Sequence, residues 1–223
     1  MSICAVTRNI GTGKSCNEDL YLQTIALYAT DHLRHEFPKL FASLIDEMEK
    51  RVLDSGGNDV LGEYFEVNFA RNNAGQVFTP YHICKMMVEC VGDTPNRENR
   101  QPLRILDPCC GSGRMLIAAA QTLGGRHEYY GIDIDETCVK MTALNLFLNG
   151  VFHGEVMWAN SLDPDDFRGS YALSFFPLGI FHITEKENSL LWQMHQNSFL
   201  RPRMEPPLLP EGEETEGSQL QLF

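Results

Sequence analysis

Long apolar runs are missing from this sequence, and so is the cysteine spacing of a metal site or a disulfide framework. No stretch approaches the roughly 20 apolar residues that span a bilayer, and the N-terminus has no basic start followed by an apolar core. The seven cysteines are scattered, without a Cys-x-x-Cys pair or a histidine at ligand spacing. We therefore expect a cytoplasmic protein with reduced, packed thiols, no metal and no membrane partner.

Basic residues are also scarce. Lys and Arg number 18 against 30 Asp and Glu, which gives a formal net charge of −12. The segment 201–223 carries five Glu and two Arg, so it contributes −3 and leaves −9 on the rest. A protein of this charge does not grip a polyphosphate by long-range electrostatics alone. If nucleic acid is the substrate, a local basic patch or a partner must supply the contacts.

A complete nucleoside triphosphate loop is absent as well. Gly11-Thr-Gly-Lys-Ser15 matches the end of the pattern GxxxxGK[ST], but the first glycine position of that pattern falls on Arg8. No apolar strand precedes it either. We interpret residues 1–16 as a flexible basic N-terminal segment.

What the chain does contain is a strand, a glycine turn and a helix in succession. Leu103 to Asp107 reads as an apolar strand that ends in an acid, Gly111 and Gly113 form the turn, and residues 115–123 form a helix. This order places an acid and free backbone N–H groups beside a helix N-terminus, where α/β sheets bind nucleotide-like ligands.

The same alternation continues through the middle of the chain. Strands are expected at 128–135, 155–159 and 171–176, with a helix at 136–149 between the first two. This pitch predicts an α/β fold with a doubly wound, mainly parallel sheet.

Three regions follow from composition and periodicity. Residues 1–58 form a helical N-terminal segment, with helices expected at 17–34 and 40–53, and residues 59–200 form the ligand-binding domain. Within this domain a helix is expected at 81–91. Residues 201–223 hold four Pro and five Glu without periodicity, so we expect a disordered acidic tail.

The residues around the glycine turn indicate which class of nucleotide-like ligand to expect. A dinucleotide fingerprint needs a third glycine at position 116, which is Leu116, and Asp107 would repel a pyrophosphate. A sulfonium nucleoside suits the pattern better, because Asp107 can meet its ammonium group and Asp133 its ribose diol. Asn160, after the third strand, is placed to meet the adenine ring.

Four motifs carry a resemblance to a known family. Asp59-Val-Leu-Gly-Glu-Tyr-Phe-Glu66, Gly75-Gln-Val-Phe-Thr-Pro80, Asp107-Pro-Cys-Cys-Gly-Ser-Gly113 and Tyr130-Gly-Ile-Asp-Ile-Asp135 are similar to those of the modification (M) subunits of type I restriction systems and related adenine-N6 DNA methyltransferases. The resemblance implies a class I, Rossmann-like methyltransferase fold, S-adenosylmethionine as cofactor, and DNA as substrate through a specificity subunit. It also implies a bacterial host, or a phage or mobile element within one.

The resemblance also implies which residues hold the cofactor. The loop at Phe78 would hold the methionine end, the glycines would allow close approach, and the later strand ends would meet the ribose and the base. The implied cofactor-binding residues are Phe78, Thr79, Pro80, Asp107, Pro108, Gly111, Gly113, Asp133, Ile134, Asn160, Ser161 and Leu162.

The catalytic motif departs from the family pattern. Members carry Asn, Asp or Ser followed by Pro-Pro and an aromatic residue, whereas this chain has Ser174, Phe175, Phe176 and Pro177. In the family such groups accept the hydrogens of the adenine amine and stack on the flipped base. Two hypotheses follow: a methyltransferase in which Ser174 and the Phe175 carbonyl orient the amine, or a cofactor-binding or interaction module without turnover.

The C-terminus resembles the sliding-clamp-binding motif of bacteria. The sequence Gln219-Leu-Gln-Leu-Phe223 matches Gln-Leu-x-Leu-Phe, in which Leu220, Leu222 and Phe223 would insert into a clamp pocket. A clamp partner would bring a protein of charge −12 to DNA. The alternatives are a chance apolar end or one that folds back on the body.

Overall fold

The computed structural model of this chain describes residues 7–9, 22–24, 26–28, 36–53, 59–68, 78–92, 102–124, 127–163, 165–176 and 178–200. The glycine-rich segment 11–15, the tail 201–223 and Pro177 lie outside the described residues, as does most of the helix expected at 17–34.

The described elements follow the predicted alternation of strands and helices. They are β1 (Thr7–Asn9), α3 (Phe37–Leu53), α4 (Val60–Asn68), α5 (Tyr81–Gly92), β2 (Arg104–Asp107), α6 (Arg114–Leu123), β3 (Glu128–Asp133), α7 (Glu136–Leu148), β4 (His153–Trp158), β5 (Gly169–Ser174), β6 (Gly179–Ile183), the 3-10 helix η2 (Lys186–Asn188) and α8 (Leu190–Leu200). None of these helices combines the length and apolar composition that a membrane crossing requires. The helices expected at 40–53 and 81–91 are confirmed within a few residues.

The strands form one mixed sheet in the order β1-β6-β5-β4-β3-β2. β2, β3 and β4 run parallel, as the sequence predicts. β5 runs antiparallel to β4 and to β6, so the sheet is mixed around its parallel β2–β4 part. The physical reason is the short connection: its described residues, 159–163 and 165–168, contain no helix, and a parallel return needs a longer crossover.

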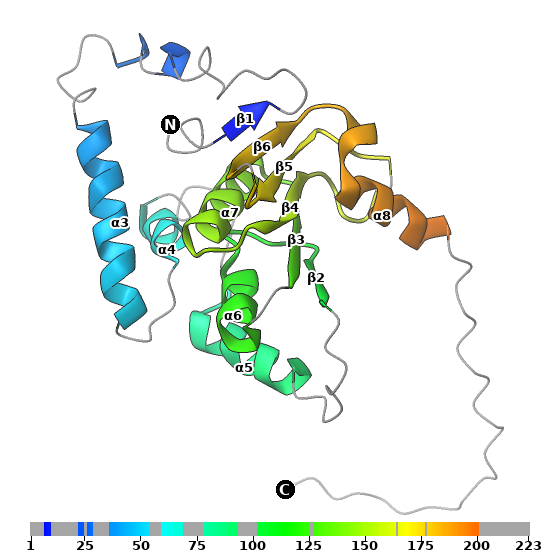
Figure 1. Cartoon of the computed structure of the whole chain (residues 1–223), viewed down its shortest axis with the longest axis horizontal. Helices are drawn as coiled ribbons and strands as arrows, with labels where there is room; N and C mark the ends of the chain where they lie inside the picture. The colour runs from blue at the N-terminus through cyan, green and yellow to red at the C-terminus, as the bar shows by residue number, and fades with distance from the viewer. Residues whose placement is uncertain are drawn as a thin grey trace, which may run out of the picture.

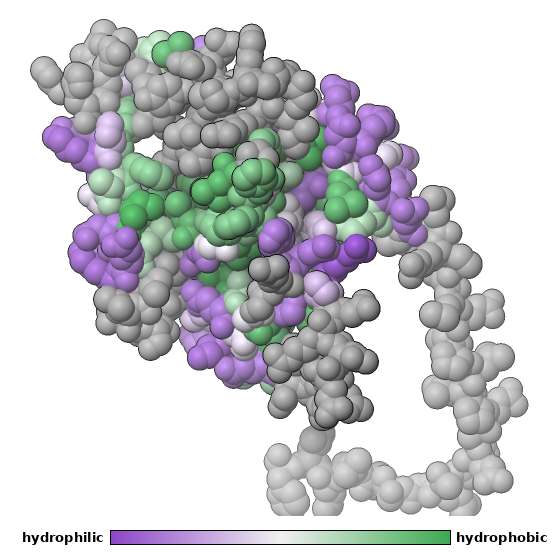
Figure 2. All heavy atoms as spheres, in the orientation of Figure 1, coloured by the Kyte–Doolittle hydropathy of each residue, from purple (hydrophilic) through white to green (hydrophobic). Residues whose placement is uncertain are grey.

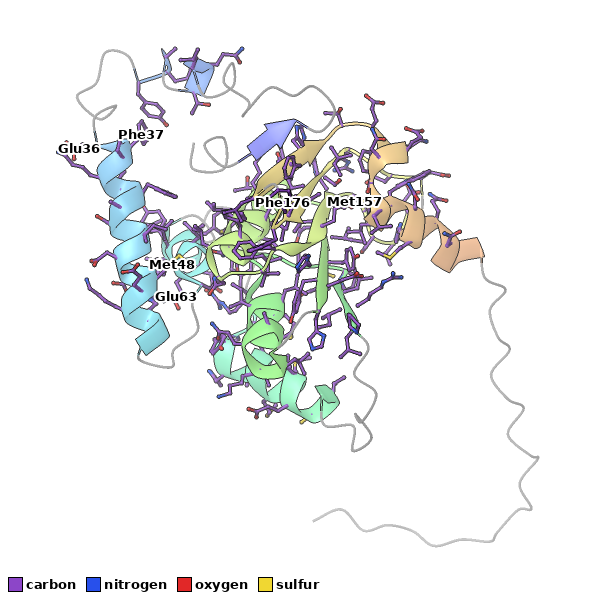
Figure 3. The ribbon with its side chains drawn as sticks, in the orientation of Figure 1. Glu36, Phe37, Met48, Glu63, Met157 and Phe176 are labelled. Atoms are coloured by element: carbon purple, nitrogen blue, oxygen red, sulfur yellow. The ribbon has the colours of Figure 1, made fainter. Side chains whose placement is uncertain are left out.

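Helices cover both faces of the sheet. Because neighbouring residues of a strand point to opposite faces, their side chains join two different apolar clusters. Tyr129 and Val156 join the apolar cluster under α5, α6 and α7, whereas Tyr130 and Met157 join the cluster under α8. Figure 1 shows α5 and α6 side by side below the sheet, with α8 at its other side. In Figure 3, Met157 of β4 lies on the side of α8.

The N-terminal helix α3 stands at the edge of the molecule and contacts α4. Arg51 donates from Nη1 to Glu63 Oε2 at 2.7 Å, and Figure 3 shows Met48 and Glu63 where the two helices face each other. Met48 is buried, with 4% exposed surface. α3 therefore acts as a support for α4, which in turn reaches the ligand-binding turn.

Candidate cofactor site

The carboxyl ends of β2, β3 and β4 meet at one edge of the sheet, as the sequence predicts. Asp107 ends β2 and Asp133 ends β3, and Asp133 lies opposite Trp158, the last residue of β4. The turn between Asp107 and α6 lies in the same place, because the Cys110 N–H donates to the Ile132 carbonyl at 2.9 Å. The structure thus brings the predicted acids and the glycine turn together.

The two turn glycines are required by geometry. Gly111 has φ +54 and Gly113 has φ +84, in the left-handed region that favours glycine. A Cβ on Gly111 would lie 2.8 Å from Phe78 Cδ1, and one on Gly113 would lie 2.9 Å from Thr142 Cγ2. Both positions therefore require glycine, because Phe78 and Thr142 lie where a Cβ would point.

Asp133 holds the turn in shape. Its Oδ2 accepts from the Gly111 N–H at 2.8 Å, and its Oδ1 accepts from the Asp135 N–H at 2.9 Å. Each carboxylate oxygen retains a second lone pair for a hydroxyl donor. Asp133 therefore braces the turn and keeps acceptor capacity for a further donor.

Asp107 lies near the carboxylate of Asp133. Its Oδ1 accepts from the Cys109 N–H at 3.1 Å. Burial raises the pKa of Asp107 above the usual range, and the nearby Asp133 raises it further. Two acids that share a partly buried edge are stabilised by a cation, which fits the ammonium group of a sulfonium amino acid and not a phosphate.

The residues after β4 form the far side of the site. The Asn160 N–H donates to Asp166 Oδ2 at 2.6 Å, and its side-chain Oδ1 accepts from the Leu162 N–H at 3.1 Å. The Ser161 carbonyl accepts a hydrogen bond from His195 Nε2 at 2.9 Å. Leu162 and Ile134 are exposed, at 84% and 58%. Leu162 therefore exposes its side chain from a loop whose backbone these bonds hold, and Ile134 does so from the turn after β3.

An apolar cavity of about 590 Å³ adjoins Asp107 and Pro108 at the sheet edge. Its walls come from α5, β2 and α6. The lining residues are Met87, Val88, Val91, Leu103, Arg104, Ile105, Leu106, Asp107, Pro108, Met115, Leu116, Ala119 and Leu123. Among the described strands, β2 pairs only with β3, so it is an edge strand, and its residues line this cavity.

The Phe78 loop lies directly on the glycine turn. The Phe78 ring stacks on Phe65 with centroids 5.9 Å apart, and its backbone N–H donates to Glu66 Oε1 at 2.9 Å. Thr79 and Pro80 are exposed, and the Pro80 carbonyl accepts from the N–H groups of Ile83 and Cys84 at the start of α5. The loop therefore lies over the glycine turn, beside Gly111, and outside the lining of the cavity described above.

A buried polar cluster under the turn was missed as a functional element by sequence reasoning. Asp59 is 1% exposed and accepts from Gly62, Ser112, Arg114 and Asn145. The signal was present in the sequence. Thr142 and Asn145 are polar residues one helical turn apart on the buried side of α7, where an apolar face is otherwise expected.

The predicted catalytic residues lie elsewhere. Ser174 pairs with His153 at the start of β4, whereas Asp133 lies opposite Trp158 at its end. Five residues of strand separate those two levels, about 17 Å. Phe175 and Phe176 are exposed, at 61% and 92%, and the Phe175 ring meets Phe152 with centroids 5.7 Å apart.

Figure 3 places Phe176 at the turn that joins β5 to β6, and Figure 2 shows apolar surface gathered in that part of the view. The antiparallel direction of β5 therefore carries the Ser174 motif away from the edge that holds Asp107. Pro177 lies outside the described residues.

The described elements form an α/β fold whose sheet edge carries two acids, Asp107 and Asp133, beside a glycine turn. The sequence profile of the N-6 DNA Methylase family matches residues 57–176, and the chain belongs to that family.

Three proteins illustrate the similarity. The chain is 27% identical over 146 residues to the type II restriction enzyme and methyltransferase RM.BcgI of Heyndrickxia coagulans, covering 57% of this chain and 22% of that protein. It is 34% identical over 116 residues to the type II methyltransferase M.MamI of Microbacterium ammoniaphilum, covering 44% and 32%. It is 30% identical over 139 residues to the type I restriction enzyme MjaVII methylase subunit of Methanocaldococcus jannaschii, covering 57% and 23%.

A solved structure was also matched, that of a modification subunit of a putative type I restriction enzyme from Vibrio vulnificus. The identity is 21% and the TM-score 0.37, over 53% of this chain and 25% of that one. The chain spans between about a fifth and a third of the length of the curated relatives described above.

Proposed function

We propose that this chain binds S-adenosylmethionine at the carboxyl ends of β2, β3 and β4 and serves adenine-N6 methylation of DNA in the bacterial cytoplasm. One observation carries the proposal: Asp107 and Asp133 lie beside the left-handed turn at Gly111, so an ammonium group can pair with one carboxylate and a ribose diol can donate to the other. When bound, the cofactor would supply an electrophilic methyl group on its sulfonium.

The chain's own residues would hold that cofactor. Asp107 would pair with the ammonium group, the Phe78 loop would cover the methionine end, and Asp133 would accept from the ribose. Asn160, Ser161 and Leu162, with Ile134 across from them, would border the adenine ring. Pro108, Thr79 and Pro80 would complete the walls.

A second candidate function is favoured by the position of Ser174. If Ser174, Phe175, Phe176 and Pro177 are to orient the adenine amine, they must approach the cofactor edge, and β5 directs Ser174 to the opposite one. The chain alone would then bind the cofactor without transferring its methyl group. A partner would have to supply the base-orienting groups.

The two candidates are separated by paired measurements on the full chain. Calorimetry with S-adenosylmethionine tests binding, and tritium transfer from the labelled cofactor to unmethylated DNA tests turnover. Binding with transfer supports the first candidate, and binding without transfer supports the second. Absence of binding contradicts both.

Partners are proposed from the relatives and the tail. The similarity to a type I methylase subunit supports DNA as substrate, with a specificity subunit as partner. The sequence Gln219-Leu-Gln-Leu-Phe223 supports a bacterial sliding clamp as a further partner. A peptide of residues 211–223 should bind a purified clamp, and a chain truncated after residue 210 should not. Equal affinity of the truncated and full chains contradicts the clamp proposal.

A further inference from the structure

The buried cluster under the glycine turn begins at Asp59. Its Oδ1 accepts from the Gly62 N–H at 2.9 Å and from Asn145 Nδ2 at 2.7 Å. Its Oδ2 accepts from Ser112 Oγ at 2.5 Å and from Arg114 Nε at 2.8 Å. One carboxylate thus ties α4, the turn, α6 and α7 together.

Arg114 occupies an unfavourable place for a cation, because it is the first residue of α6 and the helix dipole is positive there. Its side chain is only 8% exposed. Two carboxylates offset this cost: Asp59 on Nε, and Glu66 on Nη2 at 2.9 Å. The remaining nitrogen, Nη1, donates to the Thr79 carbonyl at 3.2 Å.

Glu66 completes the connection to the loop. Its Oε2 accepts from Arg114, and its Oε1 accepts from the Phe78 N–H at 2.9 Å. The Phe78–Thr79 segment is therefore held from two directions, by Glu66 at its N–H and by Arg114 at its carbonyl. This arrangement presses the Phe78 ring onto Gly111, where no Cβ would fit.

We propose that the Arg114–Glu66 pair is a positioning element that sets the Phe78–Thr79 loop over the glycine turn and so shapes the methionine end of the cofactor pocket. Arg114 and Glu66 act through Phe78 and Thr79. The proposal rests on the proposed function for its cofactor, but the placement of the loop can be measured without one.

The experiment compares Glu66→Gln with Glu63→Gln in the full chain. Glu63 lies on the same helix, pairs with Arg51 and faces α3, so its substitution is a matched loss of one charge. In Glu66→Gln the amide of Phe78 should exchange with solvent at least about 10-fold faster than in Glu63→Gln. Hydrogen exchange read residue by residue by NMR measures this.

Cofactor affinity gives the second readout. Glu66→Gln should weaken S-adenosylmethionine binding about 10-fold by calorimetry, while its melting temperature stays within about 5 °C of that of Glu63→Gln. Equal Phe78 exchange in the two variants overturns the positioning role, and so does faster exchange with unchanged affinity. If the wild-type chain binds no S-adenosylmethionine, the proposed function fails, and the exchange comparison alone decides whether the pair sets the loop.

Discussion

Gly111 shows how one residue can be fixed by two separate physical requirements. Its φ of +54 is a conformation that L side chains rarely adopt, and a Cβ would lie 2.8 Å from the Phe78 ring. Gly150 offers a control, because its φ of +79 imposes a similar backbone cost and nothing lies within 4 Å of a Cβ placed there.

We predict that Gly111→Ala lowers the free energy of unfolding by about 1–3 kcal/mol and abolishes cofactor binding, because both strain and the displaced Phe78 ring act there. Gly150→Ala should lose only the part of the unfolding free energy that backbone strain causes. It should bind S-adenosylmethionine as the wild type does. Urea denaturation and calorimetry measure the two effects. Similar losses of binding in both variants would contradict a specific role for Gly111.

Asp107 predicts a pH dependence of binding. Its carboxylate must be ionised to pair with an ammonium group, and burial together with Asp133 raises its pKa above the usual aspartate range. As pH falls through this raised pKa, the carboxylate is protonated and affinity is lost. We therefore expect affinity for S-adenosylmethionine to fall on acidification with a midpoint above that of an ordinary aspartate.

Calorimetry across the acidic range checks this expectation. Asp107→Asn should bind weakly at every pH and lose most of the pH dependence. An unchanged pH profile in that variant would assign the dependence to another group.

At the scale of elements, α8 is fixed to the sheet by one buried carboxylate. Glu155 of β4 is 3% exposed and accepts from the hydroxyls of Ser170 and Ser189 and from the N–H groups of Leu190 and Leu191 at the start of the helix. A negative charge at a helix N-terminus is favourable, and these donors satisfy it.

We predict that Glu155→Gln lowers the free energy of unfolding by about 1–3 kcal/mol, because an acceptor oxygen becomes a donor that faces other donors. Glu187→Gln, in the exposed 3-10 helix before α8, should change stability by less than about 0.5 kcal/mol. Chemical denaturation of the two variants measures the difference. Equal stability would mean that α8 is held by its apolar contacts alone.

The direction of β5 decides how far the Ser174 motif lies from Asp107 and Asp133. Sequence reasoning predicted the strand itself well, and β5 begins within two residues of the expected start. It could not assign the direction, because an alternating or apolar strand reads the same whether it pairs parallel or antiparallel. Only the short connection after β4 indicated a hairpin-like return.

At the scale of the whole molecule, the cofactor edge and the Ser174 motif lie at opposite ends of β4. We predict that Ser174→Ala leaves the affinity for S-adenosylmethionine within about 2-fold of the wild type, whereas Asp133→Ala weakens it at least about 10-fold. Calorimetry on both variants tests this separation. A large loss of affinity in Ser174→Ala would contradict it.

The predicted cofactor residues divide into those that a local pattern fixes and those that depend on distant partners. Asp107, Gly111 and Gly113 belong to one strand–turn–helix segment, so their proximity follows from the sequence. Phe78 lies on the same turn while Glu66 holds its N–H and Arg114 holds the Thr79 carbonyl, and these two side chains come from different elements. The sequence marked the Asp59–Glu66 motif as specific without revealing that it supports the loop.

The sequence by itself determined the parallel β2–β4 core, the glycine turn and the acids at the strand ends, because these depend on local periodicity and on the rule that parallel strands end at one edge. Tertiary structure alone decided the Asp59 cluster, the placement of the Phe78 loop and the removal of Ser174 from the cofactor edge. These features depend on hydrogen bonds and strand pairings between residues far apart in the chain. A local sequence pattern does not show which of these distant pairs form.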